Sequence, residues 1–180
     1  MTSIPESEWA FAVSFMTMRA FDKGAFLVRA GEYLEHFYFI VRGLVRFYYS
    51  TEDGKTYNKH FAMENGFAGS LHSFILRTPC PFSIQALEPA DTIVLPNREL
   101  RKLFDRHSCW ERMGRKNAER LALLKEEREK AFLLDSLEGR YRHFLKTYPT
   151  LPDRIAQYHI ASYLGVTDVA LSRIRKNHKF

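Results

Sequence analysis

Short apolar runs, separated by glycines and polar turns, fill the chain between residues 23 and 95. Each run has the length and the β-branched or aromatic content typical of a strand. The pair Asp53-Gly54, between two such runs, is a strong signal for a hairpin. Many short strands with regular turns predict an antiparallel sandwich or barrel. The predicted strands cover residues 25–29, 38–42, 44–50, 55–61, 82–87 and 92–95.

The pattern is helical on both sides of this region. Apolar residues between positions 9 and 16 are interleaved with small ones and predict a short helix before the barrel. After Pro96 the chain is rich in Glu, Lys, Arg and Leu and has no proline until Pro149. Gly139 is expected to end a long helix and to precede a shorter one over 140–148.

The long helix carries a short heptad pattern, with spacings of four, three, four and three residues. Such a seam suits a dimer interface between two copies of the chain. The same spacing also suits a helix that packs on its own barrel. The seam consists of Asn117, Leu121, Leu124, Arg128 and Ala131.

The stretch 157–176 predicts two helices joined by a tight turn. Gly165 stands where the first helix needs a residue that tolerates a left-handed conformation. Val166 can fill the corner, and the hydroxyl of Thr167 is a natural N-cap for the second helix. The apolar positions that would face one another are Ile160, Ala161, Leu164, Leu171 and Ile174. This is the helix-turn-helix pattern, although an ordinary helical hairpin has the same features.

The free face of the second helix carries groups suited to base edges and phosphates. Charge favours the DNA-binding interpretation, because residues 140–180 hold eight basic and two acidic side chains, whereas the first 139 residues balance. A basic excess confined to the motif is typical of a polyanion partner. The candidate DNA contacts are Thr167, Asp168, Val169, Ser172, Arg173 and Lys176.

Composition bounds the class of protein. With 46% hydrophobic residues the chain can form a packed core. Cys80 and Cys109 lack CxxC spacing and are interpreted as reduced thiols, which predicts a cytoplasmic protein. The longest apolar run is 37–41, so we expect no membrane-spanning segment.

The order of barrel, long helix and helix-turn-helix resembles the Crp/Fnr superfamily of bacterial transcription regulators over nearly the whole chain. The residues that carry the likeness are Lys23-Gly24, Gly31-Glu32, the hairpin YFIVRGLVRFYY followed by Asp53-Gly54, the segment GFAGSLHSF, and IASYLGVTDVALSRIRK. The resemblance implies an α+β fold with a cupin-like antiparallel β-barrel that senses a small molecule, a dimerisation helix and a DNA-binding helix-turn-helix.

The implied division is a sensor barrel with its N-terminal helix over 1–106, a dimerisation helix over 107–134 and a DNA-binding domain over 135–180. The implied partners are double-stranded DNA, a second copy of the chain, a small-molecule effector and RNA polymerase. Position by position, Asp168, Val169 and Arg173 fall where the family reads bases, and Arg173 matches the family's residue type. Thr167, Ser172 and Lys176 are expected to meet phosphate.

This sequence departs from the family at the phosphate-binding cassette. In members that bind cyclic AMP, the cassette is a Gly-Glu-Leu followed by Arg and a small hydroxyl residue. Gly69 and Leu71 match, but Ser70 replaces Glu, Cys80 replaces Arg and Pro81 replaces the hydroxyl residue. Without a guanidinium opposite the phosphate, we do not expect cyclic AMP to bind. Arg77 could substitute only in a remodelled loop. The candidate pocket residues for another effector are Gly69, Ser70, Leu71, Cys80 and Phe82.

Two further departures concern cofactors and the C-terminus. Members of the Fnr type hold an iron-sulfur cluster through several cysteines, mostly near the N-terminus, and this sequence has none before Cys80. We therefore expect no cofactor. The sequence ends four residues after Lys176, where relatives continue into a β-hairpin wing, so affinity is expected to come from the helices and the dimer.

Two rival functions remain. A cupin-type metal enzyme would use His60 and His72, but these are twelve residues apart and no His-x-His occurs, so no enzyme is predicted. A sensor or scaffold that has lost DNA binding would share the barrel and the dimer helix. The aromatic residues of the barrel could line an apolar cavity, although a closed core is the expected arrangement. They are Phe61, Phe67, Phe74 and Phe82.

Overall fold

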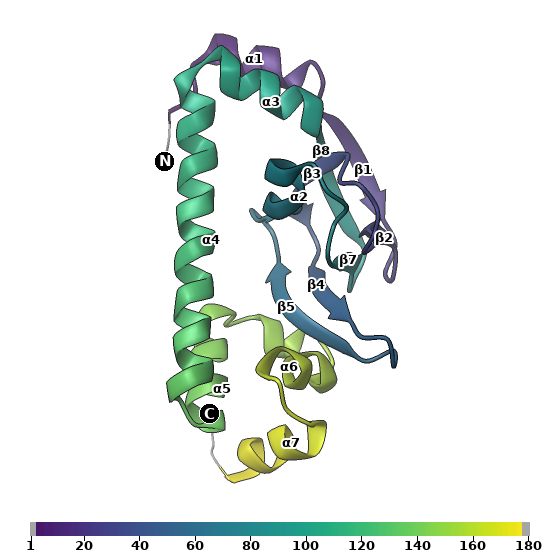
Figure 1. The fold of residues 1–180 in the computed structure, drawn as a ribbon, viewed down its shortest axis with the longest axis vertical. Coiled ribbons are helices and arrows are strands. Elements are labelled where there is room, and N and C mark those ends of the chain that lie inside the picture. Colours follow the sequence, from purple (N-terminus) through teal and green to yellow (C-terminus); the bar gives the residue numbers. More distant parts are fainter. Residues whose placement is uncertain (1–2, 178–180) are drawn as a thin grey trace.

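A computed structural model describes residues 3–177 and has an α+β fold, as predicted. A two-sheet barrel lies beside one long helix, with short helices gathered at both ends of that helix (Figure 1). The helices are α1 (Glu6–Val13), α2 (Leu71–Leu76), α3 (Asn97–Arg106), α4 (Ser108–Leu134), α5 (Leu137–Thr147), α6 (Gln157–Leu164) and α7 (Asp168–Asn177), with a 3-10 turn at Leu151–Asp153.

Within residues 3–177, eight strands form two antiparallel sheets of four. The first sheet has the order β1-β8-β3-β6 and the second the order β2-β7-β4-β5. Buried and half-buried positions nearly alternate in β8, as expected where one face of a strand is packed. The strands are β1 (Thr17–Phe21), β2 (Phe26–Val28), β3 (His36–Arg42), β4 (Val45–Ser50), β5 (Thr56–Ala62), β6 (Phe67–Ala68), β7 (Ser83–Ala86) and β8 (Ala90–Pro96).

The segment YFIVRGLVRFYY is not a hairpin, and this prediction was wrong. Its two halves, β3 and β4, lie in different sheets and do not pair. Gly43 carries the chain between the sheets with φ of 103°, and a Cβ there would lie 2.5 Å from the Pro89 carbonyl oxygen. The hairpin at Asp53-Gly54 is correct, since β4 pairs with β5 around it. Alternating apolar residues predict strands, but they do not say which strands are partners.

Three elements were not predicted: β1, β6 and α2. Strand β1 pairs with β8 along its whole length, yet four of its five residues are exposed, so its sequence TMRAF has no continuous apolar run. Strand β6 has two residues and α2 has six, which is too short for a periodic signal.

The long helix ends at residue 134, the bound implied by the family resemblance, and not at Gly139, where the glycine predicted the break. Helix α4 ends at Leu134, and the Ser136 side chain caps α5 by accepting a hydrogen bond of 3.2 Å from the Gly139 amide. Gly139 therefore lies in the first turn of α5 and does not separate the helices, because the serine cap sets the helix start.

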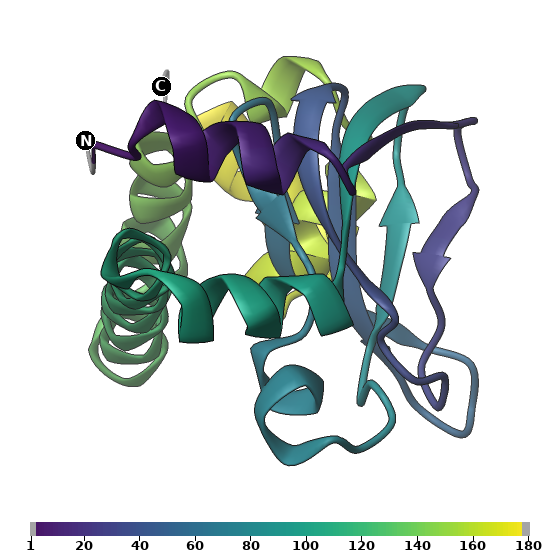
Figure 2. The ribbon, with the colours of Figure 1, turned by 90° about the horizontal axis from the view of Figure 1, so that it is seen from above.

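Three apolar clusters hold the molecule together. The first fills the barrel, the second joins the barrel to α5, α6 and α7, and the third packs α1, α3 and the start of α4 together. Helices α1 and α3 lie at the same end of the molecule as the start of α4, the end seen from above in Figure 2. The four predicted barrel aromatics are divided among these regions: Phe82 is in the first cluster, Phe61 in the second and Phe74 in the third, while Phe67 is half-buried. They therefore do not line one common cavity. No helix within residues 3–177 is long and apolar enough to cross a membrane.

Candidate functional site

Helices α6 and α7 form the helix-turn-helix that the sequence predicted. Gly165 ends α6 in the left-handed region, with φ of 70°. The hydroxyl of Thr167 caps α7 by accepting a hydrogen bond of 3.2 Å from the Ala170 amide. Ala161 is buried where the helices meet, and Leu171 is fully buried on α7. Each local prediction for the turn is therefore confirmed.

The opposite face of α7 is open to solvent. Asp168, Val169, Arg173 and Lys176 are exposed, and Ser172 is half-buried. Val169 is 61% exposed, so its side chain is accessible to an external group. The Arg173 side chain makes no hydrogen bond or ion pair to another described residue. This face presents two cations, one carboxylate and one apolar group along about two helical turns.

Two arginines hold the end of α6. An Arg128 Nη donates to the Tyr163 carbonyl oxygen at 3.0 Å, and an Arg140 Nη donates to the Leu164 carbonyl oxygen at 3.1 Å. These carbonyls belong to the last turn of α6, where cations are stabilised by the helix dipole and by unpaired acceptors. The motif is thereby fixed to α4 and α5.

The residues of the predicted dimer seam lie on one face of α4, buried or half-buried. Arg128 and Ala131 make contacts within their own chain. Arg128 caps α6 and lies over the Phe132 and Tyr163 rings, and Ala131 is buried. Asn117, Leu121 and Leu124 are half-buried. The most exposed apolar side chains of α4 are instead Leu123, Leu133 and Leu134.

Strand β5 holds the other side of α6. The buried Asn58 amide donates to the His159 carbonyl oxygen at 2.9 Å. Ser162 Oγ accepts from the Asn58 backbone amide at 2.9 Å and donates to the Thr56 carbonyl at 2.8 Å. The contacts of Asn58 and Ser162 were not predicted, because a polar residue in a strand gives no sign of a partner 101 residues away in the sequence.

An ion-pair cluster joins the barrel to the loop before α6. Arg154 donates to both carboxylate oxygens of Glu64 at 2.9 Å and also to Glu88. Its hydrogen bonds to Glu64 lower the pKa of that carboxyl to about 2. Glu64 also accepts from the Gly43 amide at 2.9 Å, so the pair fixes the turn between the two sheets.

His60 lies inside the junction, and its Nδ1 is 3.0 Å from the Tyr148 hydroxyl oxygen. Burial first, and nearby cations second, lower the pKa of His60 to about 3. Burial and the cations Arg46 and Lys23 lower the pKa of His159 to about 4. Both imidazoles are therefore neutral in the folded protein at neutral pH, and His60 is a structural residue.

We expect the protein to lose stability in mild acid. In the unfolded chain these histidines take up protons near pH 6.5, whereas in the folded chain they resist protonation until about pH 3 to 4. The stabilising contribution of the neutral imidazoles is therefore fully present above pH 6.5, and the free energy of unfolding falls as the pH drops. For His60 alone the loss is roughly 2 to 3 kcal/mol at about pH 4.5.

Urea unfolding across this pH range measures the loss of stability. His60→Gln should flatten the dependence and His72→Gln, on exposed α2, should not; an equal slope in all three proteins would contradict the assignment.

The cassette residues pack mostly against other residues of the chain. A Cβ built on Gly69 would lie 2.2 Å from the Phe37 ring, so an aromatic side chain packs against this turn. Ser70 is buried and caps α2 by accepting from the Ser73 amide at 3.2 Å. Cys80 and Phe82 belong to the barrel core, and Leu71 points outward with 41% exposure. The five candidate pocket residues are therefore not gathered around one opening.

Within the described residues, no three His, Cys, Asp or Glu side chains lie close enough to hold a metal ion together. Both cysteines are buried free thiols.

The fold and sequence together place the chain in a family. The model of the cyclic nucleotide-binding domain family matches residues 18–107, half of the chain. The chain belongs to this family, and its fold is that of the Crp/Fnr regulators, as the sequence resemblance indicated.

Solved structures share this fold at low sequence identity. FixK2 from Bradyrhizobium japonicum is 17% identical with a TM-score of 0.81, over 90% of this chain and 83% of that chain. A putative Crp/Fnr-family transcriptional regulator from Eubacterium rectale is 12% identical with a TM-score of 0.77, over 97% and 83% of the chains. The c-di-GMP-responsive global regulator CLP of Xanthomonas campestris is 14% identical with a TM-score of 0.76, over 96% and 91%. No curated protein matches the sequence.

Proposed function

We propose that the protein is a DNA-binding transcription regulator of the Crp/Fnr type that binds a palindromic operator as a dimer. The observation that carries this proposal is the exposed face of α7, with Val169 and Arg173 uncovered while Leu171 on the opposite face is buried. A recognition helix needs this division, because one face must pack and the other must reach base edges.

Within this proposal Arg173 contacts guanine and Val169 contacts a thymine methyl group. Asp168 accepts from a cytosine amine or favours the helix dipole. Thr167, Ser172 and Lys176 contact phosphates. The Thr167 hydroxyl can serve both roles, because it caps α7 as an acceptor and can still donate its own proton.

Residues 1–106, 107–134 and 135–180 act as sensor, dimerisation and DNA-binding parts in this proposal. Pairing through α4 is supported by its exposed leucines, Leu123, Leu133 and Leu134. The barrel senses a molecule other than cyclic AMP, or none. The support for this is the packing of Phe37 against Gly69 and the place of Cys80 in the core.

We expect the purified protein to bind a fragment of its own promoter more tightly than a random fragment, with a steep salt dependence. A DNA-binding protein that makes about six phosphate contacts loses roughly 10³-fold in affinity between about 50 and 200 mM salt. A salt series of binding titrations on both fragments measures this. Weak and equal binding to both fragments would contradict the proposal and favour a scaffold that has lost DNA binding.

A further inference from the structure

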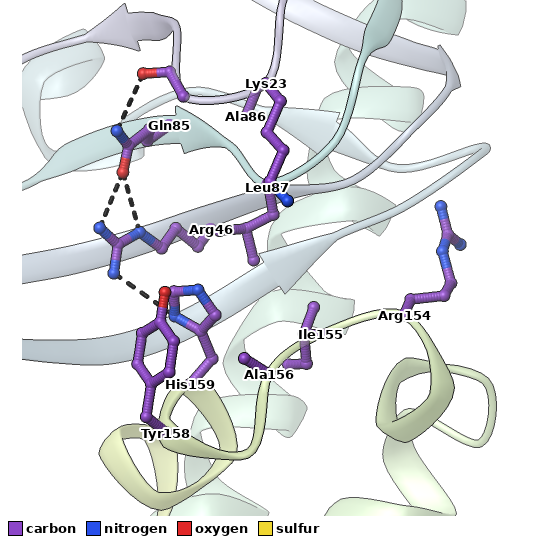
Figure 3. Close-up of a pocket in the computed structure, with 11 residues that line it drawn as sticks. Lys23, Arg46, Gln85, Ala86, Leu87, Arg154, Ile155, Ala156, Tyr158 and His159 are labelled. Carbon is purple, nitrogen blue, oxygen red and sulfur yellow. Dashed lines mark hydrogen bonds between the residues drawn. The ribbon is translucent and has the colours of Figure 1, made fainter.

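A pocket of about 300 Å³ lies between the second sheet and the start of α6 (Figure 3). Its lining includes three cations, Lys23, Arg46 and Arg154, and no carboxylate among the described residues. Lys23 and Arg46 approach from the barrel, while Tyr158 and His159 face them from α6. The pocket therefore spans the junction of the two parts of the molecule.

The Arg46 guanidinium has only neutral partners. Its Nε and one Nη donate to Gln85 Oε1 at 3.1 and 2.7 Å, and the other Nη lies 3.5 Å from His159 Nδ1. It also lies over the Tyr48 ring, 3.9 Å from the ring centre. Burial lowers the Arg46 pKa. A half-buried cation without a carboxylate partner is costly, so this site favours an anion.

The other two cations of the pocket differ in their partners. Arg154 is compensated, because it pairs with Glu64 and Glu88 outside the pocket. Lys23 is exposed and forms no ion pair with another described residue. Positive charge from Arg46 and Lys23 also reaches His159, whose lowered pKa reflects burial first and these two cations next. Two positive charges thus remain without a counter-charge at the pocket.

The start of α6 adds a third feature that favours an anion. Its N-cap is Ala156, which supplies no side-chain acceptor for the first amides of the helix. The His159 amide donates to the Ala156 carbonyl oxygen at 3.0 Å, while the helix dipole and the two amides before it make such an end favourable for phosphate. Beside it, Leu87 and Ile155 give the pocket an apolar wall, and the Tyr158 ring is 54% exposed. These groups suit the organic part of a phosphorylated molecule.

We propose that this pocket binds a small organic phosphate between Lys23, Arg46 and the first turn of α6. Gln85 occupies Nε and one Nη of Arg46, so the other Nη, beside His159, is the group that donates to a phosphate oxygen, and the lysine adds a second charge. Such a ligand touches the barrel and the helix-turn-helix at once, so its binding holds α6 against the sheet. The inference goes beyond DNA binding, because the pocket takes phosphate whether or not α7 reads an operator.

Adenosine 5′-monophosphate is the probe, with adenosine as the control that lacks phosphate. We expect saturable calorimetric binding of the monophosphate and none of adenosine, with a shift of the His159 imidazole NMR signals. Lys23→Gln and Arg46→Gln should each weaken binding at least roughly tenfold through loss of a charge-assisted contact. Arg42→Gln should bind normally, since Arg42 is 72% exposed and pairs with Asp91 in the other sheet.

If Arg46→Gln does not fold, Lys23→Gln alone tests the phosphate site, because Lys23 lies at an exposed turn where a substitution should not disturb the fold. Circular dichroism and thermal unfolding establish that each variant is native. The proposal is overturned if the monophosphate does not bind, if adenosine binds equally well, or if native Lys23→Gln binds with unchanged affinity. It is also overturned if the monophosphate leaves the His159 imidazole signals unmoved while Lys23→Gln weakens binding of a DNA duplex. That combination would mean that Lys23 contacts DNA and not a small phosphate.

Discussion

An Arg173→Ala variant is expected to lose its preference for the operator over random DNA while keeping its fold and oligomeric state. Arg173 is exposed on α7, and no described residue pairs with its side chain. A bidentate contact from arginine to guanine contributes about 1 to 3 kcal/mol of discrimination. Removing it should therefore reduce the ratio of the two affinities by at least roughly fivefold at each half-site.

Arg175→Ala is the matched control, because it removes the same charge from the same helix. Arg175 is directed elsewhere, with an Nη donating to Gln157 Oε1 at 3.2 Å. We expect it to weaken binding to both fragments alike without changing their ratio. Titrations of both variants on operator and random fragments, with light scattering to follow the oligomeric state, separate the outcomes. If Arg173→Ala still discriminates between the operator and the random fragment as well as the unmodified protein does, Arg173 does not contact bases.

The second large effect is expected at Phe61, at the centre of the junction. Its side chain is 2% exposed on β5, and its ring centroid lies 5.7 Å from those of Tyr148 and Tyr163. Phe61→Ala should lower the free energy of unfolding by about 3 to 5 kcal/mol, through lost burial and the cavity left behind. Because this cluster contains residues of the barrel and of the C-terminal helices, both parts should unfold in one transition at lower urea.

Tyr57→Ala provides the control on the same strand, since Tyr57 is 45% exposed. Its expected loss is less than about 1 kcal/mol. Urea unfolding followed by fluorescence and by circular dichroism tests whether the two probes coincide. Two separate transitions, with only one of them shifted by Phe61→Ala, would show that the barrel and the helix-turn-helix are independent units.

The helix-turn-helix was predictable in detail because its signals are local. A left-handed glycine at position 165, a threonine cap at 167 and apolar positions three and four residues apart are all decided within about twenty residues. The strands of the barrel were found for the same reason, through runs of β-forming residues between turns. Strand β1 was missed because an edge strand with four exposed residues lacks such a run.

The long helix shows the limit of a periodic pattern. The spacing of residues 117–131 identified one face of α4 and left open whether this face meets a second chain or its own. The structure shows that Arg128 caps α6 of its own chain. Spacing along a helix specifies which residues share a face, whereas the neighbour of that face depends on how distant segments pack.

The sequence by itself therefore determined the fold class, most of the elements, the helix-turn-helix and the exposed face of α7. The tertiary structure alone decided that β3 and β4 belong to different sheets and that Phe37 packs against the Gly69 turn. It also decided that β5 holds α6 and that Lys23, Arg46 and His159 line one pocket. Helix caps and periodicity arise from neighbours in the chain, but these contacts join residues that meet only when the whole molecule has folded.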